Sequence, residues 1–157
     1  MYKRQDRYWL ASVQTLGELG LELGREDYCR LTIERLTPYR GRVCIVGLCA
    51  AIGTLVDTAL GQAWLGLGNA ERAEGFFRDA LDQAERIRAP HFAVVARRFL
   101  ARTLATRGLE ADAVTMLHTV LSDTRRFGFT REEATTASML DQLRASAVDG
   151  EPEPNVI

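Results

Sequence analysis

The sequence predicts an all-α fold, a right-handed stack of antiparallel helical hairpins with about seven helices. Three observations support this fold class. Apolar residues recur at alternating steps of three and four along much of the chain, which is the spacing of one helix face. The pattern returns at a fixed offset, as it does in proteins built from helical repeats. No segment shows sustained alternation of apolar and polar residues, and no Asn-Gly or Asp-Gly turn joins two such segments.

The internal repeat is clearest at an offset of 40 residues. At this offset residues of similar size and polarity coincide, in the pairs Leu60/Leu100, Gly68/Gly108, Ala73/Ala113, Phe77/Leu117 and Ala80/Val120. A weaker copy lies earlier at an offset of 44, with Gly24 on Gly68 and Cys29 on Ala73. Each copy has the pattern of a helical hairpin, because its glycine tolerates the left-handed conformation that ends a helix.

The first two helices are predicted at 5–22 and 25–36, on either side of the helix stop at Gly24. A long, glycine-rich third helix is predicted at 42–66. Its charge-free stretch over residues 43–56 is too short to span a bilayer and is typical of a buried helix. No strand is predicted anywhere in the chain.

The remaining four helices are predicted at 70–88, 91–107, 110–127 and 131–147. Asn69 is a suitable N-cap for the first of them, because its side chain can accept a hydrogen bond from a free backbone N–H group. Pro90 breaks the chain between the first and the second, since its ring disfavours helical geometry at the residue before it. Gly128 ends the third, and the last helix follows it.

Residues 1–148 are predicted to form a single helical-repeat domain, because 157 residues with 46% apolar content can bury one core. The segment 149–157 is acidic and rich in proline, and we predict that it is a disordered tail. No apolar segment of signal-peptide length follows the N-terminus. We therefore expect a cytoplasmic protein with no membrane contact.

Composition argues against several classes of function. The formal net charge is −1, so the chain lacks the basic surface expected of a nucleic-acid binder. Three cysteines are too few and odd in number for a disulfide framework, and we interpret Cys29, Cys44 and Cys49 as small buried hydrophobes. Several arginines are interpreted as helix surface or as part of a groove: Arg86, Arg88, Arg97, Arg98, Arg102 and Arg107.

Candidates for catalysis and metal binding are few. His91 and His118 do not belong to a His-x-x-x-His or Glu-x-x-His pattern, and there is no Cys-x-x-Cys pair. We therefore expect no catalytic residue, no metal and no cofactor. Asp57 is the residue that would change this expectation, because burial without a partner would raise its pKa and favour an enzyme.

The second copy of the repeat carries the sparse pattern of tetratricopeptide repeats, in Leu60, Gly61, Trp64, Gly68, Ala73, Phe77 and Ala80. Residues 36–42 and 67–77 extend the likeness. Over about residues 6–128 the chain resembles the C-terminal helical-repeat region of bacterial ATP-binding transcriptional regulators of the LuxR/maltose-regulator type. The shared motifs concern packing, so the resemblance implies the fold and a place in bacterial regulation. The relatives carry an ATPase module upstream and often a DNA-binding helix-turn-helix downstream. This sequence contains neither module and no Gly-x-x-x-x-Gly-Lys-Ser/Thr motif, so neither ATP hydrolysis nor direct DNA binding is expected.

A binding groove can be predicted from the repeat, because the first helix of each stacked hairpin lines the concave face. Its expected lining is Gln14, Glu18 and Glu22, then Thr58, Gln62 and Leu65, then Val95, Arg98 and Arg102. Such a groove is acidic at one end and basic at the other. Arg98 and Arg102 lie one turn apart and are the candidates to bind a carboxylate or an acidic peptide. The alternative is that these charges form a solvated helix face.

The leading hypothesis is a non-catalytic interaction module that binds a protein partner or peptide in its concave groove. A homodimer through the first helix is a variant of it, because that helix is rich in apolar and aromatic residues: Tyr2, Tyr8, Trp9 and Leu10. The alternatives are a small-molecule sensor, with an apolar pocket beside Trp64, and an enzyme on the same scaffold that uses Asp57, His91 or Arg98.

Overall fold

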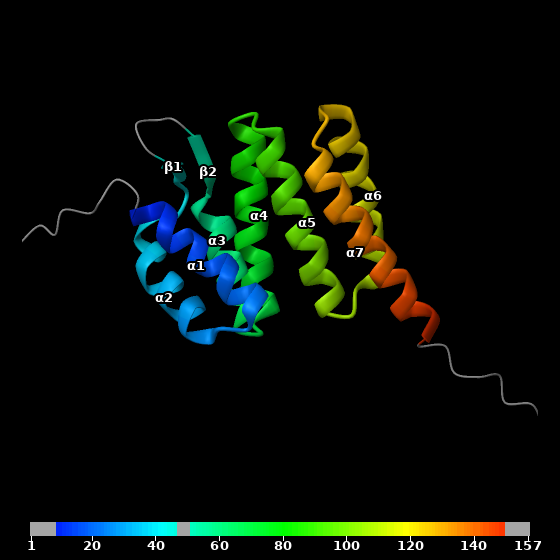
Figure 1. Cartoon of the computed structure of the whole chain (residues 1–157), viewed down its shortest axis with the longest axis horizontal. Coiled ribbons are helices and arrows are strands. Elements are labelled where there is room, and N and C mark those ends of the chain that lie inside the picture. The colour runs from blue at the N-terminus through cyan, green and yellow to red at the C-terminus, as the bar shows by residue number, and fades with distance from the viewer. Residues whose placement is uncertain (1–8, 47–50, 150–157) are drawn as a thin grey trace, which may run out of the picture.

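The computed structural model describes residues 9–46 and 51–149, and within them the chain is all-α with one added pair of strands. Figure 1 shows α1, α2 and α3 at one end of the molecule, α4 and α5 in the middle, and α6 and α7 at the other end. The elements are α1 (Trp9–Leu23), α2 (Glu26–Leu36), the 3₁₀ turn η1 (Thr37–Tyr39), β1 (Val43–Val46), β2 (Ala51–Leu55), α3 (Val56–Gly66), α4 (Ala70–Arg86), α5 (Pro90–Thr106), α6 (Glu110–Phe127) and α7 (Thr130–Asp149).

The predicted helix boundaries are confirmed wherever glycine or asparagine marks them. Gly24, Gly68, Gly108 and Gly128 all have positive φ, between 64° and 75°, at the end of a helix. The side chain of Asn69 accepts a hydrogen bond from the backbone N–H of Arg72, at 3.0 Å, and so caps α4.

The prediction of a helix over 42–66, and of no strand, is wrong in its first half. Residues 43–46 and 51–55 form the antiparallel strands β1 and β2, with Val43 opposite Leu55 and a bulge between Val43 and Ile45. Only Val56–Gly66 is helical. The physical reason is composition, since this stretch is rich in β-branched residues, and periodicity alone does not separate a short apolar strand from a buried helix.

The repeat predicted from the sequence is visible as a repeat of burial. Cys29, Ala73 and Ala113, which share one repeat position, are all completely buried. A second set at one position, formed by Leu36, Ala80 and Val120, is also completely buried. Each small residue leaves room for the adjoining helix to approach, and each large one fills the space between helices.

Three glycines allow the closest approaches between helices. A Cβ atom at Gly20 or at Gly66 would lie 2.6 Å from Sγ of Cys29, so the thiol occupies the space that both glycines leave open. A Cβ at Gly61 would lie 2.6 to 2.8 Å from the ring of Phe77. Cys29 thus occupies the small-residue packing position that the sequence predicts for it.

The last helix is longer than predicted and ends at Asp149, which the sequence assigns to the disordered tail. The rest of that predicted tail, residues 150–157, lies outside the described residues. So do residues 5–8 of the first predicted helix, together with Tyr2. The division of the chain into a domain at 1–148 and a tail stays a prediction.

Candidate functional site

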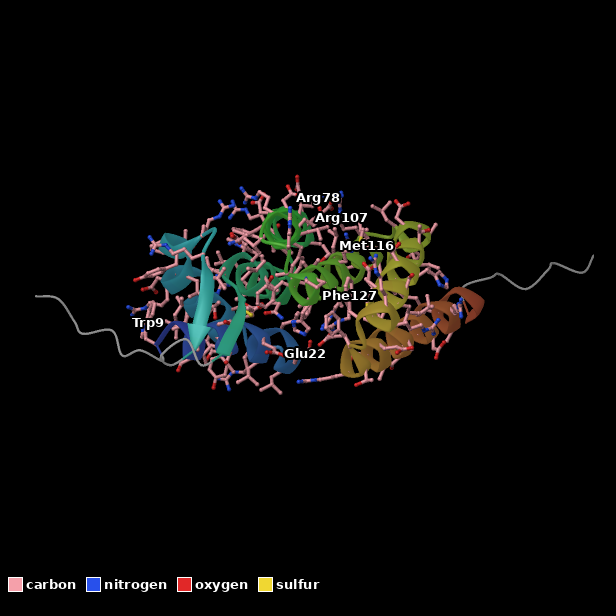
Figure 2. All side chains as sticks on the ribbon, turned by 90° about the horizontal axis from the view of Figure 1, so that it is seen from above. Trp9, Glu22, Arg78, Arg107, Met116 and Phe127 are labelled. Carbon is pink, nitrogen blue, oxygen red and sulfur yellow. The ribbon has the colours of Figure 1, made fainter. Side chains whose placement is uncertain are left out.

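A groove of about 910 Å³ is lined by residues of four alternate helices and of one strand. Its lining comes from α1, β2, α3, α5 and α7. Seen from above in Figure 2, Glu22 at the end of α1 lies on the opposite side of the molecule from Arg78 of α4 and from Arg107. The groove therefore belongs to the side of the molecule that carries Glu22.

The structure brings together all six principal residues of the predicted groove. Glu22 and Val95, which were also predicted, line the groove as well. The six principal residues are Gln14, Glu18, Thr58, Gln62, Arg98 and Arg102. Leu65 is the exception. It is buried in the core with Phe77 and Phe99 and does not line the groove, because it points to the neighbouring face of α3.

Residues that line the groove occupy equivalent positions in successive copies of the sequence repeat. Gln14, Thr58 and Arg98 share one repeat position on α1, α3 and α5, and Glu18, Gln62 and Arg102 share the next position, one turn later. The same 40-residue offset reaches α7 at Ser138 and Gln142, and both residues line the groove.

The contribution of α7 is the part that sequence reasoning missed. Its residues in the groove are Arg131, Glu132, Thr135, Ser138, Met139, Gln142 and Leu143. The 40-residue offset could have identified two of them. Adding 40 to the numbers of Arg98 and Arg102 gives Ser138 and Gln142. Residues Gly53 and Thr54 of β2 were missed for a different reason, since the sequence places them in a helix.

Arg98 and Arg102 are paired with carboxylates of the chain itself. Nη2 of Arg98 lies 3.1 Å from Oε2 of Glu132 on α7, and Nη1 of Arg102 lies 2.6 Å from Oε1 of Glu22 on α1. The predicted division into an acidic and a basic end is therefore wrong, because each arginine is matched by a glutamate from another helix. Neither guanidinium is a free clamp for an acidic ligand.

Uncharged polar groups on α3 line the groove between these ion pairs. Gln62 is only 6% exposed and Thr58 only 2%, and neither side chain has a hydrogen-bond partner among the residues that the structure describes. Three fully buried atoms in the groove lack a hydrogen-bond partner among the described residues: Oε1 of Gln14, Nε of Arg98 and Oε2 of Glu132, the last of which is held only by the ion pair with Arg98. Buried polar groups are normally hydrogen-bonded, so this surface retains unused hydrogen-bonding capacity.

The histidines offer little chemistry. His91 lies at the rim of the groove with its side chain half exposed, 3.9 Å from Glu132 and in edge contact with the ring of Phe129. His118 lies 3.4 Å from a guanidinium nitrogen of Arg144. Over residues 9–46 and 51–149, no group of three or more His, Cys, Asp or Glu side chains is placed to hold a metal ion.

Asp57 is buried, but it has partners. Its Oδ2 accepts a hydrogen bond from the backbone N–H of Gly41 at 2.7 Å, and Nε of Arg40 donates to its Oδ1 at 3.3 Å. These donors compensate the burial of the carboxylate. The argument for a catalytic role of Asp57 is thereby removed.

The described cysteines are buried. Burial raises the pKa of both the Cys29 and the Cys44 thiol, with the nearby carboxylates of Glu26 and Asp27 adding to the rise at Cys29. Thiols held in their neutral form are poor nucleophiles. Cys44 lies on β1 rather than on the predicted helix, and Cys49 lies outside the described residues.

Two other members of the arginine cluster, Arg97 and Arg107, belong to ion pairs between helices. Arg97 bonds to Glu85 of α4 and to Asp123 of α6, at 2.7 and 2.6 Å. Arg107 bonds to Glu74. This supports the interpretation of the cluster as ordinary helix surface.

No family model matches the sequence, and no curated protein or solved structure matches the chain. In the part of the chain that the structure describes, no helix combines the length and the apolar character needed to cross a membrane. The function is therefore argued from the groove itself.

Proposed function

We propose that the chain is a non-catalytic interaction module of tetratricopeptide-like architecture, whose groove binds a peptide segment of a partner protein. The observation that carries the proposal is the shared register of the groove. Residues at two repeat positions on four alternate helices, α1, α3, α5 and α7, line one groove. Stacked repeats form such elongated concave surfaces, and these surfaces suit elongated ligands.

The architecture itself is supported by the recurrence of buried positions and of left-handed glycines along the chain. Consecutive helices also pack mainly on their neighbours in sequence, as stacked hairpins do. The right-handed sense of the stack, the place in bacterial regulation and the cytoplasmic location are parts of the proposal that derive from the sequence and from the family resemblance.

The proposal of a non-catalytic role rests on the state of the ionisable groups. Arg98 and Arg102 are neutralised by Glu132 and Glu22, and Asp57 is held by Arg40 and a backbone N–H outside the groove. A nucleophile or a general base must be an unpaired group that has a suitable pKa and lies next to the substrate.

A small-molecule sensor is the second candidate, and one observation favours it. The groove volume of about 910 Å³ is within the range of roughly 300–1,000 Å³ typical of small-molecule sites. Apolar side chains from α5 and α7, those of Phe92, Phe99 and Met139, supply part of its lining. The two candidates differ in the shape of the ligand rather than in the site.

Selection of random linear peptides displayed on phage, with the whole chain as bait, tests the proposal. Synthetic versions of the enriched peptides are then measured by fluorescence anisotropy against wild type and the Thr58→Val/Gln62→Leu double variant. We expect the double variant to bind about tenfold more weakly, because it lacks the two uncharged polar groups of α3. Thr119→Val on the exposed side of α6 is the matched control and should bind as wild type does.

Two results would contradict the proposal. One is equal binding by wild type and by the double variant, which would locate the peptide site elsewhere. The other is failure of the selection together with a small molecule retained by wild type in native mass spectrometry, which would favour the sensor. Circular dichroism of each variant verifies that the helices are intact.

A further inference from the structure

The charges that line the groove cancel. Three carboxylates and three guanidiniums line it, those of Glu18, Glu22 and Glu132 and those of Arg98, Arg102 and Arg131. Four of the six are engaged in the pairs between helices described above. Glu132 is only 13% exposed in its side chain, so an acidic ligand that took Arg98 from it would leave a largely buried carboxylate unpaired. The groove is therefore poorly suited to select a ligand by its charge.

Apart from Nε of Arg98 and the side chains of Glu18 and Arg131, the hydrogen-bonding groups of the groove outside its two ion pairs are neutral and have the chemistry of a peptide main chain. Gln14, Gln62 and Gln142 carry primary amides, and Thr58 and Ser138 carry hydroxyls, on four different helices. Each amide offers one acceptor and two donors, so it can match both the N–H and the C=O of a peptide group. Gln62 is only 6% exposed, and its side chain makes no hydrogen bond to the described residues; Oε1 of Gln14 is fully buried and also lacks a hydrogen-bond partner among them.

A strand edge lies at the same groove. Gly53 and Thr54 of β2 belong to the lining, and β2 is paired on one edge with β1. Within the described residues no third strand covers its other edge. An uncovered strand edge offers backbone N–H and C=O groups to another extended chain, and a glycine there lets that chain approach closely.

We infer that the groove binds an uncharged segment of a partner protein in extended conformation, recognised through its main chain by the amides of Gln62 and Gln142 and by the edge of β2. This inference rests on the proposed function and specifies its ligand. Main-chain recognition makes binding tolerant of sequence and nearly independent of salt. It also replaces the acidic peptide that the two arginines suggest when the sequence is considered alone.

The test uses three pools of immobilised synthetic peptides and the whole chain in solution. One pool contains only Gly, Ala, Ser, Thr, Asn, Gln and Val, a second adds aspartates at fixed positions, and a third adds lysines at the same positions. Binding is measured in about 0.1 M and about 1 M NaCl, between which the Debye length falls from about 10 Å to about 3 Å. Individual peptides from the neutral pool are then remade with alternate backbone nitrogens methylated.

We expect the neutral pool to bind with an affinity that changes less than about twofold between the two salt concentrations. Gln62→Leu should weaken binding about tenfold, and methylation of alternate nitrogens should abolish it. Gln142→Ala removes an exposed side chain of α7 that the fold does not need, and it should weaken binding without changing stability. Asp82→Asn, on α4 and away from the groove, should leave binding unchanged.

The outcomes separate the two proposals. Preference for the acidic or the basic pool that disappears in 1 M NaCl overturns this inference and leaves the proposed peptide-binding function intact. Retention of binding after nitrogen methylation also overturns it, since recognition would then run through side chains. Binding of no pool by folded wild-type protein overturns the proposed function, and the inference with it.

Discussion

The missing side chain of Gly61 permits the contact between α3 and α4, because the ring of Phe77 occupies the place of its Cβ. The next repeat solves the same contact with a different pair. Ala101 stands at the position of Gly61, and Leu117 stands at that of Phe77. Glycine with phenylalanine and alanine with leucine are thus alternative ways to fill one space between two helices.

The effects of substituting Gly61 and Phe77 on the free energy of unfolding should therefore depend on each other. Gly61→Ala alone is expected to lower the free energy of unfolding by about 1–3 kcal/mol, because the new methyl group overlaps the Phe77 ring. Combined with Phe77→Leu, it should cost less than the sum of the two single changes by about 1 kcal/mol or more. Urea denaturation of the two single variants and the double variant measures this coupling.

Gly75→Ala on α4 is the control for the alanine substitution itself. A Cβ there meets nothing within 4 Å, so this change should stabilise the protein by roughly 0.5–1 kcal/mol through helix propensity. Strict additivity of the Gly61 and Phe77 changes would show that the helices move apart rather than compete for one space.

A second prediction at this scale concerns Arg88, a non-glycine residue with φ of 54° at the end of α4. The corresponding residue of the next repeat is Gly128, with φ of 72°. Because a left-handed conformation costs an ordinary residue about 1–2 kcal/mol, Arg88→Gly should raise the stability by about 0.5–1 kcal/mol. The reciprocal change, Gly128→Arg, should lower it. A loss of stability in Arg88→Gly by thermal or urea unfolding would mean that the arginine side chain contributes more than its backbone costs.

At the scale of elements, helix boundaries were predictable because they depend on local chemistry, such as a left-handed glycine or an asparagine cap. The strand pair β1–β2 was not, because its pairing joins residues of a uniformly apolar stretch that fits a buried helix equally well. Groove residues on α1, α3 and α5 followed from the register of the repeat. Their ion pairs did not follow, since Glu22 and Glu132 reach the arginines only when helices distant in sequence are packed together.

Glu74 gives a prediction at this scale, because it ties α4 to the end of α5. Although burial opposes the shift, hydrogen bonds from Arg78 and Arg107 lower the pKa of Glu74 from 4.5. A lowered pKa in the folded state contributes stability that is present above 4.5 and is lost as the pH falls through the folded pKa. Glu74→Gln should therefore destabilise the protein by about 0.5–1 kcal/mol at neutral pH, and by less in acid.

Urea denaturation at neutral pH and at about pH 3 measures this change. Asp82→Asn serves as the control, because Asp82 is exposed on the same helix and has no ion pair among the described residues. An effect of Glu74→Gln that does not change with pH would attribute it to packing of the side chain rather than to its charge.

At the scale of the whole molecule, the helices contact mainly the elements next to them in sequence. When contacts run mainly between neighbours in sequence, an interior helix is held on two sides and a terminal helix on one, so stability is expected to be graded along the chain. Hydrogen exchange followed by mass spectrometry should find the slowest exchange in α4 and α5 and faster exchange in α7. Uniform protection from α1 to α7 would contradict this and indicate that the chain opens as one cooperative unit.

The packing of Cys29 between Gly20 and Gly66 has a practical consequence. Its thiol fills the space between α1, α2 and α3, so an alkylating reagent can reach it only after the first hairpin has separated from α3. The modification rate of Cys29, resolved from the other cysteines by peptide mass spectrometry, is then set by how often the hairpin opens. This cysteine is a native reporter of the opening of one end of the molecule, and it requires no engineered label.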